Sequence, residues 1–295
     1  MKVALTGATG LLGRHLVAWL SRRDIPVARI DRSNWDLQDA ITHVRLDQLA
    51  QGADVFVHCA ARIDLAGPAD DGSAWQVLFD SNVRATLNAA RWAADRDVHF
   101  IFVSSGSVYR DPHARGIDES AETAPGPLGG DYATTKRLAE AGLAELAQTS
   151  GARVTVLRPS ALYGHGLPDD KFLVRMLNDA AAGQNITVTG PKNSIDFVHA
   201  HDLSRAILQS SQAKAYGVFN ISGGGPVSLA DLAQEIMSVA GGRGVIETRP
   251  GDSPPFTRFD LSSDAARAAF GYAPVVDIAT GLEMTLRGQL LPGAA

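Results

Sequence analysis

The sequence lacks most of the features that mark specialised classes of protein. Cys59 is the only cysteine in 295 residues, which excludes an intrachain disulfide bond and a zinc site made of cysteines. Long runs of Lys or Arg are missing and the formal net charge is -5, so we expect neither a nucleic acid nor a membrane surface as an electrostatic partner. No apolar stretch reaches the length of about 18 residues that a membrane-spanning helix requires.

The first residues also lack the charged segment and long apolar core of a cleavable secretion signal. His165, His199 and His201 show no spacing with carboxylates that is typical of a metal site, so we predict no bound metal. With 45% apolar and 20% charged residues, the composition is that of an ordinary globular protein. We therefore expect a cytoplasmic protein whose partner is a small molecule.

Short apolar segments alternate with amphipathic ones through the first half of the chain. The apolar segments expected to form strands are residues 2–7, 27–32, 54–61, 98–105 and 154–159. Apolar residues recur at helical spacing in the segments between them, which are residues 11–23, 81–96 and 131–148. This alternation predicts an α/β fold, a Rossmann-type doubly wound parallel sheet with helices on both faces.

The pattern changes after Arg158. The stretch 163–194 carries Gly and Pro around one helical segment, and the last third of the chain is rich in turns. We expect a smaller C-terminal lobe that binds substrate, because a ligand of an open α/β sheet lies beyond the carboxyl ends of its strands. We assign residues 1–164 plus about 195–220 to the Rossmann domain, and about 165–194 plus 221–295 to the substrate-binding lobe.

The stretch TGATGLLG, residues 6–13, follows the first expected strand and opens the first helix. Gly7 suits a tight turn, Gly10 the close approach of a pyrophosphate, and Gly13 close packing of the helix against the sheet. The start of the helix would offer free N–H groups to phosphates. The residues expected there are Leu11 and Leu12. This stretch therefore predicts a dinucleotide-binding turn.

Asp31 ends the second expected strand, where a carboxylate can bind the hydroxyls of an adenosine ribose. A carboxylate would repel a 2′-phosphate, so Asp31 favours NAD as the cofactor. Arg32 follows directly and could bind that phosphate, which leaves NADP open. At the end of the third expected strand, the small residues Ala60 and Ala61 would let the cofactor lie close.

Tyr132 and Lys136 stand four residues apart, so on a helix their side chains share a face. A phenol with a pKa of about 10 is a poor base at neutral pH. A nearby ammonium group and a cationic nicotinamide would lower that pKa, so that Tyr132 could remove a proton from an alcohol. Ser105, at the end of the fourth expected strand, could hydrogen-bond the same substrate oxygen.

Taken in this order, these motifs resemble the extended short-chain dehydrogenase/reductase family, also called the NAD-dependent epimerase/dehydratase family. The resemblance covers nearly the whole chain, through TGATGLLG, HCAA, SNVRAT, SSGSVY, YATTK, LRPSALYGHG, DFVHAHD, NISGG and RPGD. It implies that Ser105, Tyr132 and Lys136 form a catalytic triad. It also implies that Pro159 lies near the nicotinamide, the pair Asp36 and Leu37 near the adenine, and Asn82 near the active site.

Three departures from the family pattern bear on the substrate. Gly106 and Ser107 follow Ser105 where the family's dehydratases carry Asp-Glu, so a dehydratase is not expected. Ile195 stands where nucleotide-sugar enzymes usually carry an arginine that grips the diphosphate, while the family's second arginine is present as Arg249. The stretches ARIDLAG and KNSIDFVH resemble instead the branch of 3β-hydroxysteroid dehydrogenases.

Two functions follow, with a nucleotide-sugar epimerase as the preferred one. The alternative is a dehydrogenase or reductase of a nonsugar, steroid-like or other apolar alcohol or ketone. A noncatalytic NAD(P)-binding regulator would have the same fold, although such proteins often lose the triad. We expect Asn82, Tyr109, Tyr163 and Arg249 to contact the substrate, together with Ser105. The resemblance also implies a homodimer formed through residues 74–95 and 131–149.

Overall fold

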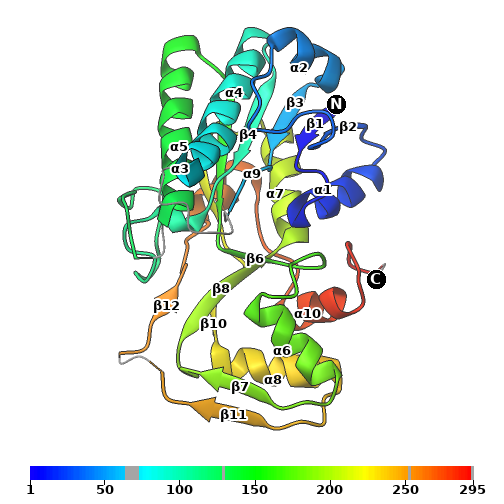
Figure 1. Ribbon diagram of the computed structural model, residues 1–295, viewed down its shortest axis with the longest axis vertical. Coiled ribbons are helices and arrows are strands. Elements are labelled where there is room, and N and C mark those ends of the chain that lie inside the picture. Colours follow the sequence, from blue (N-terminus) through cyan, green and yellow to red (C-terminus); the bar gives the residue numbers. More distant parts are fainter. Residues whose placement is uncertain (64–72, 128–129, 252–253, 294–295) are drawn as a thin grey trace.

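The computed structural model describes residues 1–63, 73–127, 130–251 and 254–293. In this part of the chain, a six-stranded sheet stands above a smaller lobe (Figure 1). Neighbouring strands of the large sheet are parallel and follow the order β2-β1-β3-β4-β5-β9. These strands are β1 (Val3–Thr6), β2 (Val27–Ile30), β3 (Val55–His58), β4 (His99–Val103), β5 (Val154–Pro159) and β9 (Gly217–Ile221).

Helices cover both faces of this sheet (Figure 1). Helices α1, α7 and α9 pack over side chains such as Leu5 and Ile101, whereas α2, α4 and α5 pack over Ala4 and Phe100. Successive residues of a strand thus enter opposite cores, which explains why the strands are apolar almost throughout. The helices are α1 (Leu11–Ser21), α2 (His43–Ala50), α3 (Ser73–Phe79), α4 (Ala85–Asp95), α5 (Gly130–Ser150), α7 (Ala200–Gln212) and α9 (Asp264–Phe270). The predicted Rossmann-type α/β fold is confirmed.

The lobe has its own sheets and its own core. Strand β8 pairs with β6, β10 and β12, and β7 pairs with β11. Three helices pack on these strands around Phe197, Leu177 and Ile236. The lobe elements are β6 (Ala161–Tyr163), α6 (Phe172–Ala181), β7 (Ile186–Thr189), β8 (Ser194–His199), β10 (Pro226–Ser228), α8 (Leu229–Ala240), β11 (Ile246–Arg249), β12 (Thr257–Arg258) and α10 (Ile278–Leu286).

The division of the chain into two domains stays a prediction, and the sheets bear on its boundaries. Strands β6 and β8 pair with each other in the lobe, although our boundaries place most of their residues in the Rossmann domain. Helix α9, from the part assigned to the lobe, packs instead against the core of the large sheet through Phe270. The chain therefore crosses between the two parts more often than the sequence pattern indicates.

The helical region before α4 departs from regular α-helix. Five residues, Asp80–Arg84, form the π-helical turn η1, which joins α3 to α4. Such turns often occur at functional sites, because the extra residue redirects the side chains around it. Here it brings Asn82 into contact with two other segments. A short 3-10 turn, η2 (Gly106–Val108), follows Ser105 after β4.

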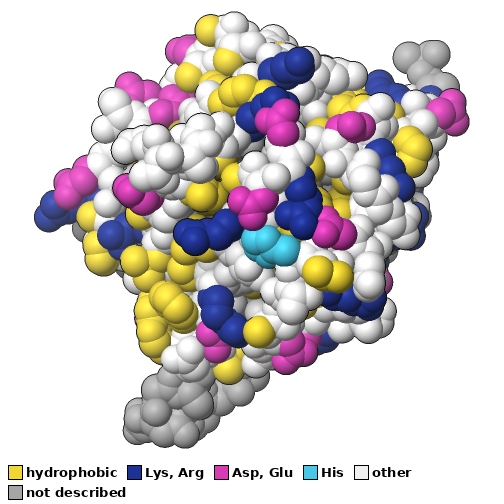
Figure 2. Space-filling model, turned by 90° about the horizontal axis from the view of Figure 1, so that it is seen from above, with side chains coloured by type: hydrophobic (Ala, Val, Ile, Leu, Met, Phe, Trp, Pro, Cys, Tyr) yellow, Lys and Arg dark blue, Asp and Glu magenta, His cyan; other side chains and the backbone are white. Residues whose placement is uncertain are grey.

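Seen from the end of the molecule above the large sheet, the surface mixes basic and acidic side chains (Figure 2). In the described residues, no helix combines the length and the hydropathy that crossing a bilayer would require. These residues also contain no group of three or more His, Cys, Asp or Glu side chains arranged to hold a metal ion.

Candidate active site

The three glycines of the first turn differ in what surrounds them. Gly7 has a φ of +74°, and a Cβ atom there would lie 2.9 Å from the nitrogen of Ala60. A Cβ atom at Gly13 would lie 2.1 Å from the carbonyl oxygen of Gly7, so the close contact that requires a glycine at this position is with the turn itself and not with a strand. At Gly10 the nearest atom, again the oxygen of Gly7, would be 3.4 Å away, an ordinary contact. Two glycines therefore serve the protein's own packing, and Gly10 leaves open space.

The start of α1 lies at the edge of a large cavity. Gly10 is the N-cap residue, no side chain caps the helix, and its first turn contains no acidic residue. The positive end of the helix dipole and the free N–H groups of the first turn therefore face any group that enters. This arrangement fits the phosphates of a dinucleotide.

The cavity has a volume of about 880 Å³ and runs along the carboxyl ends of the large sheet. Every residue predicted to contact the cofactor lies on its wall. These are Gly7, Gly10, Leu11, Leu12, Gly13, Asp31, Arg32, Asp36, Leu37, Ala60, Ala61, Tyr132, Lys136 and Pro159. Ser105 also lies on the wall. Residues more than 150 positions apart thus meet around a single space.

Asp31 is held in place by its own loop. Its carboxylate accepts hydrogen bonds from the backbone N–H and the hydroxyl of Ser33, at 2.9 and 2.6 Å. These bonds lower the pKa of Asp31, so the side chain is ionised at neutral pH. The guanidinium of Arg32 lies 3.8 Å from the carboxylate of Asp36 and is largely exposed. The edge of the cavity therefore presents a fixed anion beside an exposed cation.

Ser105, Tyr132 and Lys136 come together from two elements. Ser105 follows β4 and shares a 2.8 Å hydrogen bond with the hydroxyl of Ser107. Tyr132 and Lys136 lie one turn apart on α5, with the Lys136 nitrogen 5.8 Å from the centre of the Tyr132 ring. That nitrogen donates a 2.7 Å hydrogen bond to the carbonyl of Val103 at the end of β4. The side chain of Lys136 is thereby fixed between the helix and the sheet.

The predicted lowering of the Tyr132 pKa is not produced by the protein's own groups. Burial raises the pKa of Tyr132 to about 12, and burial lowers the pKa of Lys136 to about 8. Desolvation disfavours the charged form of each group, and a lysine whose nitrogen is nearly 6 Å from the ring does not reverse this for the phenol. A base at Tyr132 therefore requires a further positive charge in the cavity.

Four residues predicted to contact the substrate do not lie on the cavity wall. Asn82 is buried, where it bonds the backbone of Arg62 through its N–H and its carbonyl and also contacts the hydroxyl of Thr135. Tyr109 and Tyr163 are each only 1% exposed. Their rings pack in two of the hydrophobic cores. A contact of either ring with a substrate stays a prediction.

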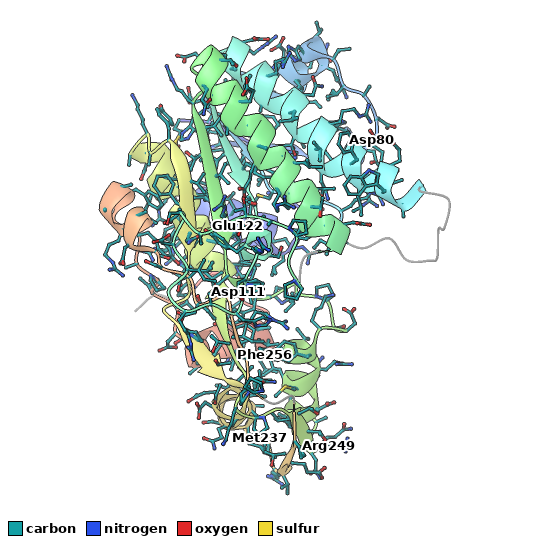
Figure 3. The ribbon with its side chains drawn as sticks, turned by 90° about the vertical axis from the view of Figure 1, so that its left-hand side faces the viewer. Asp80, Asp111, Glu122, Met237, Arg249 and Phe256 are labelled. Atoms are coloured by element: carbon teal, nitrogen blue, oxygen red, sulfur yellow. The ribbon has the colours of Figure 1, made fainter. Side chains whose placement is uncertain are left out.

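The fourth of these residues, Arg249, is exposed at the end of β11. Figure 3 shows it at the end of the lobe remote from the large sheet. Ile195, which replaces the family's other arginine, is buried in the core of the lobe. The last residue of the RPGD motif and most of the stretch ARIDLAG lie outside the described residues. The role of Arg249 in substrate binding stays a prediction.

Several residues on the lobe side of the cavity were not predicted from the sequence. Lys171 is the cation that the lobe contributes among the described wall residues. Phe259 lies on the wall with a φ of +59°, a conformation that is rare for a bulky residue. Only contacts between distant segments put these residues there. Glu140 could have been identified from the sequence, because it stands four positions after Lys136 and the two side chains therefore share a face of α5.

The chain is similar to known proteins over most of its length. The model of the NAD dependent epimerase/dehydratase family matches residues 3–222. The dTDP-4-dehydro-6-deoxy-D-allose reductase of Streptomyces bikiniensis is 30% identical over 97% of this chain and 95% of its own length. UDP-glucuronate 4-epimerase 1 of Arabidopsis thaliana is 26% identical over 98% of this chain and 77% of its own length.

A solved structure shows the same fold. The UDP-glucose 4-epimerase of Thermus thermophilus, in complex with NAD, superposes with a TM-score of 0.79 and 21% identity. The superposition covers 98% of each chain. The shared architecture thus extends through the large sheet and the lobe.

Proposed function

This chain belongs to the NAD-dependent epimerase/dehydratase family, and from that membership we propose that it is an NAD(P)-dependent oxidoreductase acting on a secondary alcohol or ketone, specifically a nucleotide-sugar epimerase. The observation that carries the proposal is the common cavity. The glycine turn, Asp31, Ser105, Tyr132 and Lys136 all face it.

The residues of the cavity fit a nicotinamide dinucleotide. The uncapped start of α1 binds the pyrophosphate, and Gly10 leaves room for it. Asp31 binds the adenosine ribose, which favours NAD, while the exposed Arg32 keeps NADP possible. Lys136 holds the nicotinamide ribose. When bound, the nicotinamide supplies a hydride acceptor and donor, and its positive charge in the oxidised form.

The catalytic roles follow from the positions of the three side chains. Ser105 donates a hydrogen bond to the substrate oxygen and orients it. Tyr132 removes the proton of that hydroxyl as hydride leaves the carbon, and returns the proton when hydride comes back. The ammonium of Lys136 and the positive charge that an oxidised nicotinamide would add favour the phenolate together. The reaction is an epimerisation when the oxidised sugar rotates within the cavity, so that hydride returns to the opposite face of the carbonyl carbon. No net oxidation of the sugar then occurs.

The experiment is to incubate the purified protein with a panel of UDP- and dTDP-sugars and follow the sugar by NMR. We expect interconversion of two epimers with no net change in the absorbance of reduced nicotinamide. Tyr132→Phe should abolish the interconversion while leaving cofactor binding intact. Equal activity in that variant would contradict the assignment of Tyr132.

A second candidate function is supported by the wall of the lobe. Leu162, Leu167 and Phe259 give this wall an apolar character, and Ile195 offers no charge. Such a wall suits a dehydrogenase or reductase of a nonsugar alcohol or ketone. This function predicts net consumption of NADH or NADPH with an apolar ketone and no epimerisation of any nucleotide sugar.

The family resemblance also leads us to propose a cytoplasmic homodimer. Helices α4 and α5 lie side by side on one face of the molecule (Figure 1). Leu138 on α5 is 41% exposed, which suits a helix that packs against another copy. Analytical ultracentrifugation tests this, since the proposal predicts a dimer and Leu138→Glu should weaken it.

A further inference from the structure

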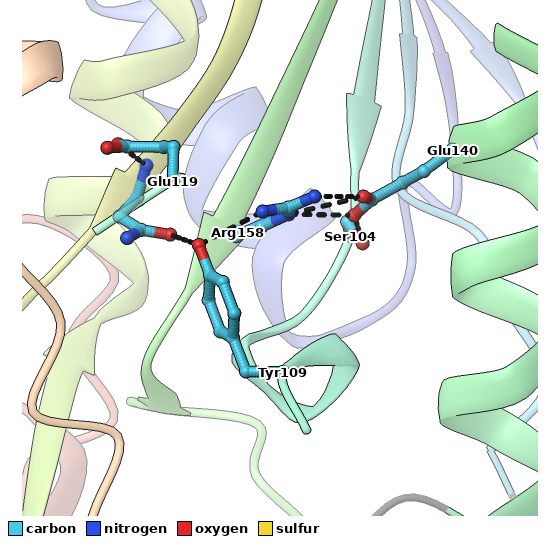
Figure 4. Close-up of polar contacts among 6 residues, drawn as sticks. Ser104, Tyr109, Glu119, Glu140 and Arg158 are labelled. Carbon is cyan, nitrogen blue, oxygen red and sulfur yellow. Dashed lines mark hydrogen bonds and ion pairs between the residues drawn. The ribbon is translucent and has the colours of Figure 1, made fainter. Parts of the chain in front are cut away.

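A chain of buried polar side chains begins beside the candidate catalytic residues and leads away from the cavity. Glu140 lies one turn beyond Lys136 on α5, and both residues are buried. Arg158, at the end of β5, donates hydrogen bonds to both oxygens of Glu140, at 3.2 Å from Nε and 2.5 Å from Nη2. The hydroxyl of Ser104 donates another to the same carboxylate. Figure 4 shows this arrangement between α5 and the sheet.

The series of hydrogen bonds continues from the same arginine toward β9, the last strand of the sheet. Its Nη1 donates a 3.0 Å bond to the hydroxyl of Tyr109, which donates a 2.6 Å bond to the side chain of Asn220 on β9. The backbone N–H of Asn220 donates to Glu119 at 2.6 Å. Arg158 is therefore fixed on both sides (Figure 4), and so is the carboxylate that it binds.

The groups around Lys136 can be compared by charge. His58 and Cys59, at the end of β3, are close enough to Lys136 for an electrostatic interaction with its ammonium group. Tyr132 and Glu140 are close to it on its own helix, α5. Burial lowers the pKa of His58 to about 3 and raises those of Cys59 and Tyr132 to about 12. These three groups are neutral at neutral pH. From β4 only uncharged groups reach Lys136, the Val103 carbonyl and the Phe102 ring.

Glu140 is thus the anion next to a buried ammonium, yet it is not the hydrogen-bond partner of that ammonium. No carboxylate of the described residues lies within 4.0 Å of the Lys136 nitrogen, which bonds a backbone carbonyl instead. The oxygens of Glu140 are occupied by Arg158 and Ser104. A carboxylate held by other groups can act on Lys136 through its charge without displacing the lysine from the cavity.

We propose that Glu140, fixed by Arg158 and Ser104, is a positioning residue that keeps Lys136 charged inside the candidate active site. The proposal rests on the proposed function for the role of Lys136 in turnover, but its effect on Lys136 is a property of the protein itself. Removing the carboxylate withdraws the attraction that favours the ammonium. It also leaves the Arg158 cation without its partner, which disfavours a second cation nearby.

The direct test is the titration of Lys136 followed by NMR of isotope-labelled lysine. The chain has five lysines, so the Lys136 signal can be assigned by its absence in Lys136→Met. Because burial already lowers the pKa of Lys136 to about 8, we expect its midpoint in Glu140→Gln to fall by about one further pH unit. The matched control is Glu145→Gln, an exposed glutamate on the same helix, which should leave the midpoint in place.

A double variant separates charge from packing. Glu140→Gln with Arg158→Gln removes both charges and keeps hydrogen-bonding groups in the same space. We expect its Lys136 midpoint to lie between those of the parent and of Glu140→Gln, because the unbalanced cation is gone. If Glu140→Gln does not fold, the double variant carries the test alone through a midpoint below that of the parent.

An unchanged or raised Lys136 midpoint in the folded variants would overturn the proposal, as would a double variant with a midpoint at or below that of Glu140→Gln. Once a substrate is known, the alkaline limb of kcat should move to lower pH in Glu140→Gln by the same amount as the NMR midpoint. A merely structural role would lower kcat without moving that limb. Since the titration needs no substrate, it stands even if the proposed function fails.

Discussion

Replacing Gly10 by alanine separates a ligand-binding role from a packing role more sharply than any other change in the first turn. Gly10 has φ -75° and ψ 177°, an extended conformation that any residue adopts. The nearest protein atom would be 3.4 Å from the new methyl group. As an N-cap substitution, Gly10→Ala should cost about 1 kcal/mol of folding free energy or less. The methyl group would instead occupy the space in which we place a pyrophosphate.

The expected loss of affinity follows from the hydrogen bonds at the start of α1. A bond between a backbone N–H and a charged phosphate contributes about 1.5–3 kcal/mol, and displacing the phosphate by a methyl group loses at least one. We therefore expect Gly10→Ala to raise the Kd for NAD roughly 10- to 100-fold, measured by isothermal titration calorimetry. Thermal unfolding of this variant without added NAD should show a Tm close to that of the parent.

Gly13→Ala is the comparison. Its Cβ atom would lie 2.1 Å from the oxygen of Gly7, so the turn itself must move. We expect it to destabilise the fold by about 1–3 kcal/mol and to weaken NAD binding as a consequence. If Gly10→Ala instead binds NAD as tightly as the parent, or loses stability as Gly13→Ala does, the reasoning about the turn is refuted.

Three further predictions concern catalysis, substrate charge and pH. Tyr132→Phe should reduce kcat by roughly 10²- to 10⁴-fold with an unchanged Kd for NAD, and a kcat near that of the parent would remove Tyr132 from the mechanism. Lys171→Ala should raise KM for a nucleotide sugar several-fold at constant kcat, whereas steady-state kinetics showing the same KM would favour an apolar substrate. Burial lowers the pKa of His58 and His199 to about 3, so below about pH 6.5 the unfolded chain takes up protons that the folded protein does not. The free energy of unfolding should therefore fall as the pH drops from about 6.5 toward 4, by roughly 1.4 kcal/mol per pH unit for each of these histidines. Asp196 opposes part of this fall, because burial raises its pKa to about 6 and the folded protein binds that proton at a higher pH than the unfolded chain does. Chemical denaturation at several pH values measures this, and a stability that rises on acidification would contradict it.

The sequence predicted those parts of the site that depend on local order. A strand, a glycine turn and a helix are neighbours along the chain, and Tyr132 and Lys136 share a helical face by their spacing alone. The carboxyl ends of parallel strands meet at one edge of a sheet, which brings Ser105 and Asp31 to the same cavity.

What the sequence did not predict depends on contacts between distant segments. Phe259 reaches the cavity only because β12 pairs with β8 across the lobe. Tyr109 looked like a substrate residue, but it bonds Arg158 and Asn220 in the interior. The pKa of Tyr132 could not be judged from a nearby lysine, since burial acts on it more strongly than that lysine does.

The central claim is that Tyr132 moves the substrate proton while hydride passes to a nicotinamide held by the glycine turn. The most direct measurement is rapid mixing of the protein and NAD with a nucleotide sugar, following the absorbance of reduced nicotinamide and the epimers formed. We predict transient reduction and a second epimer in the parent, and neither in Tyr132→Phe. Reduction and epimer formation in Tyr132→Phe at the rate of the parent, or no reaction of the parent with any nucleotide sugar, would contradict the claim.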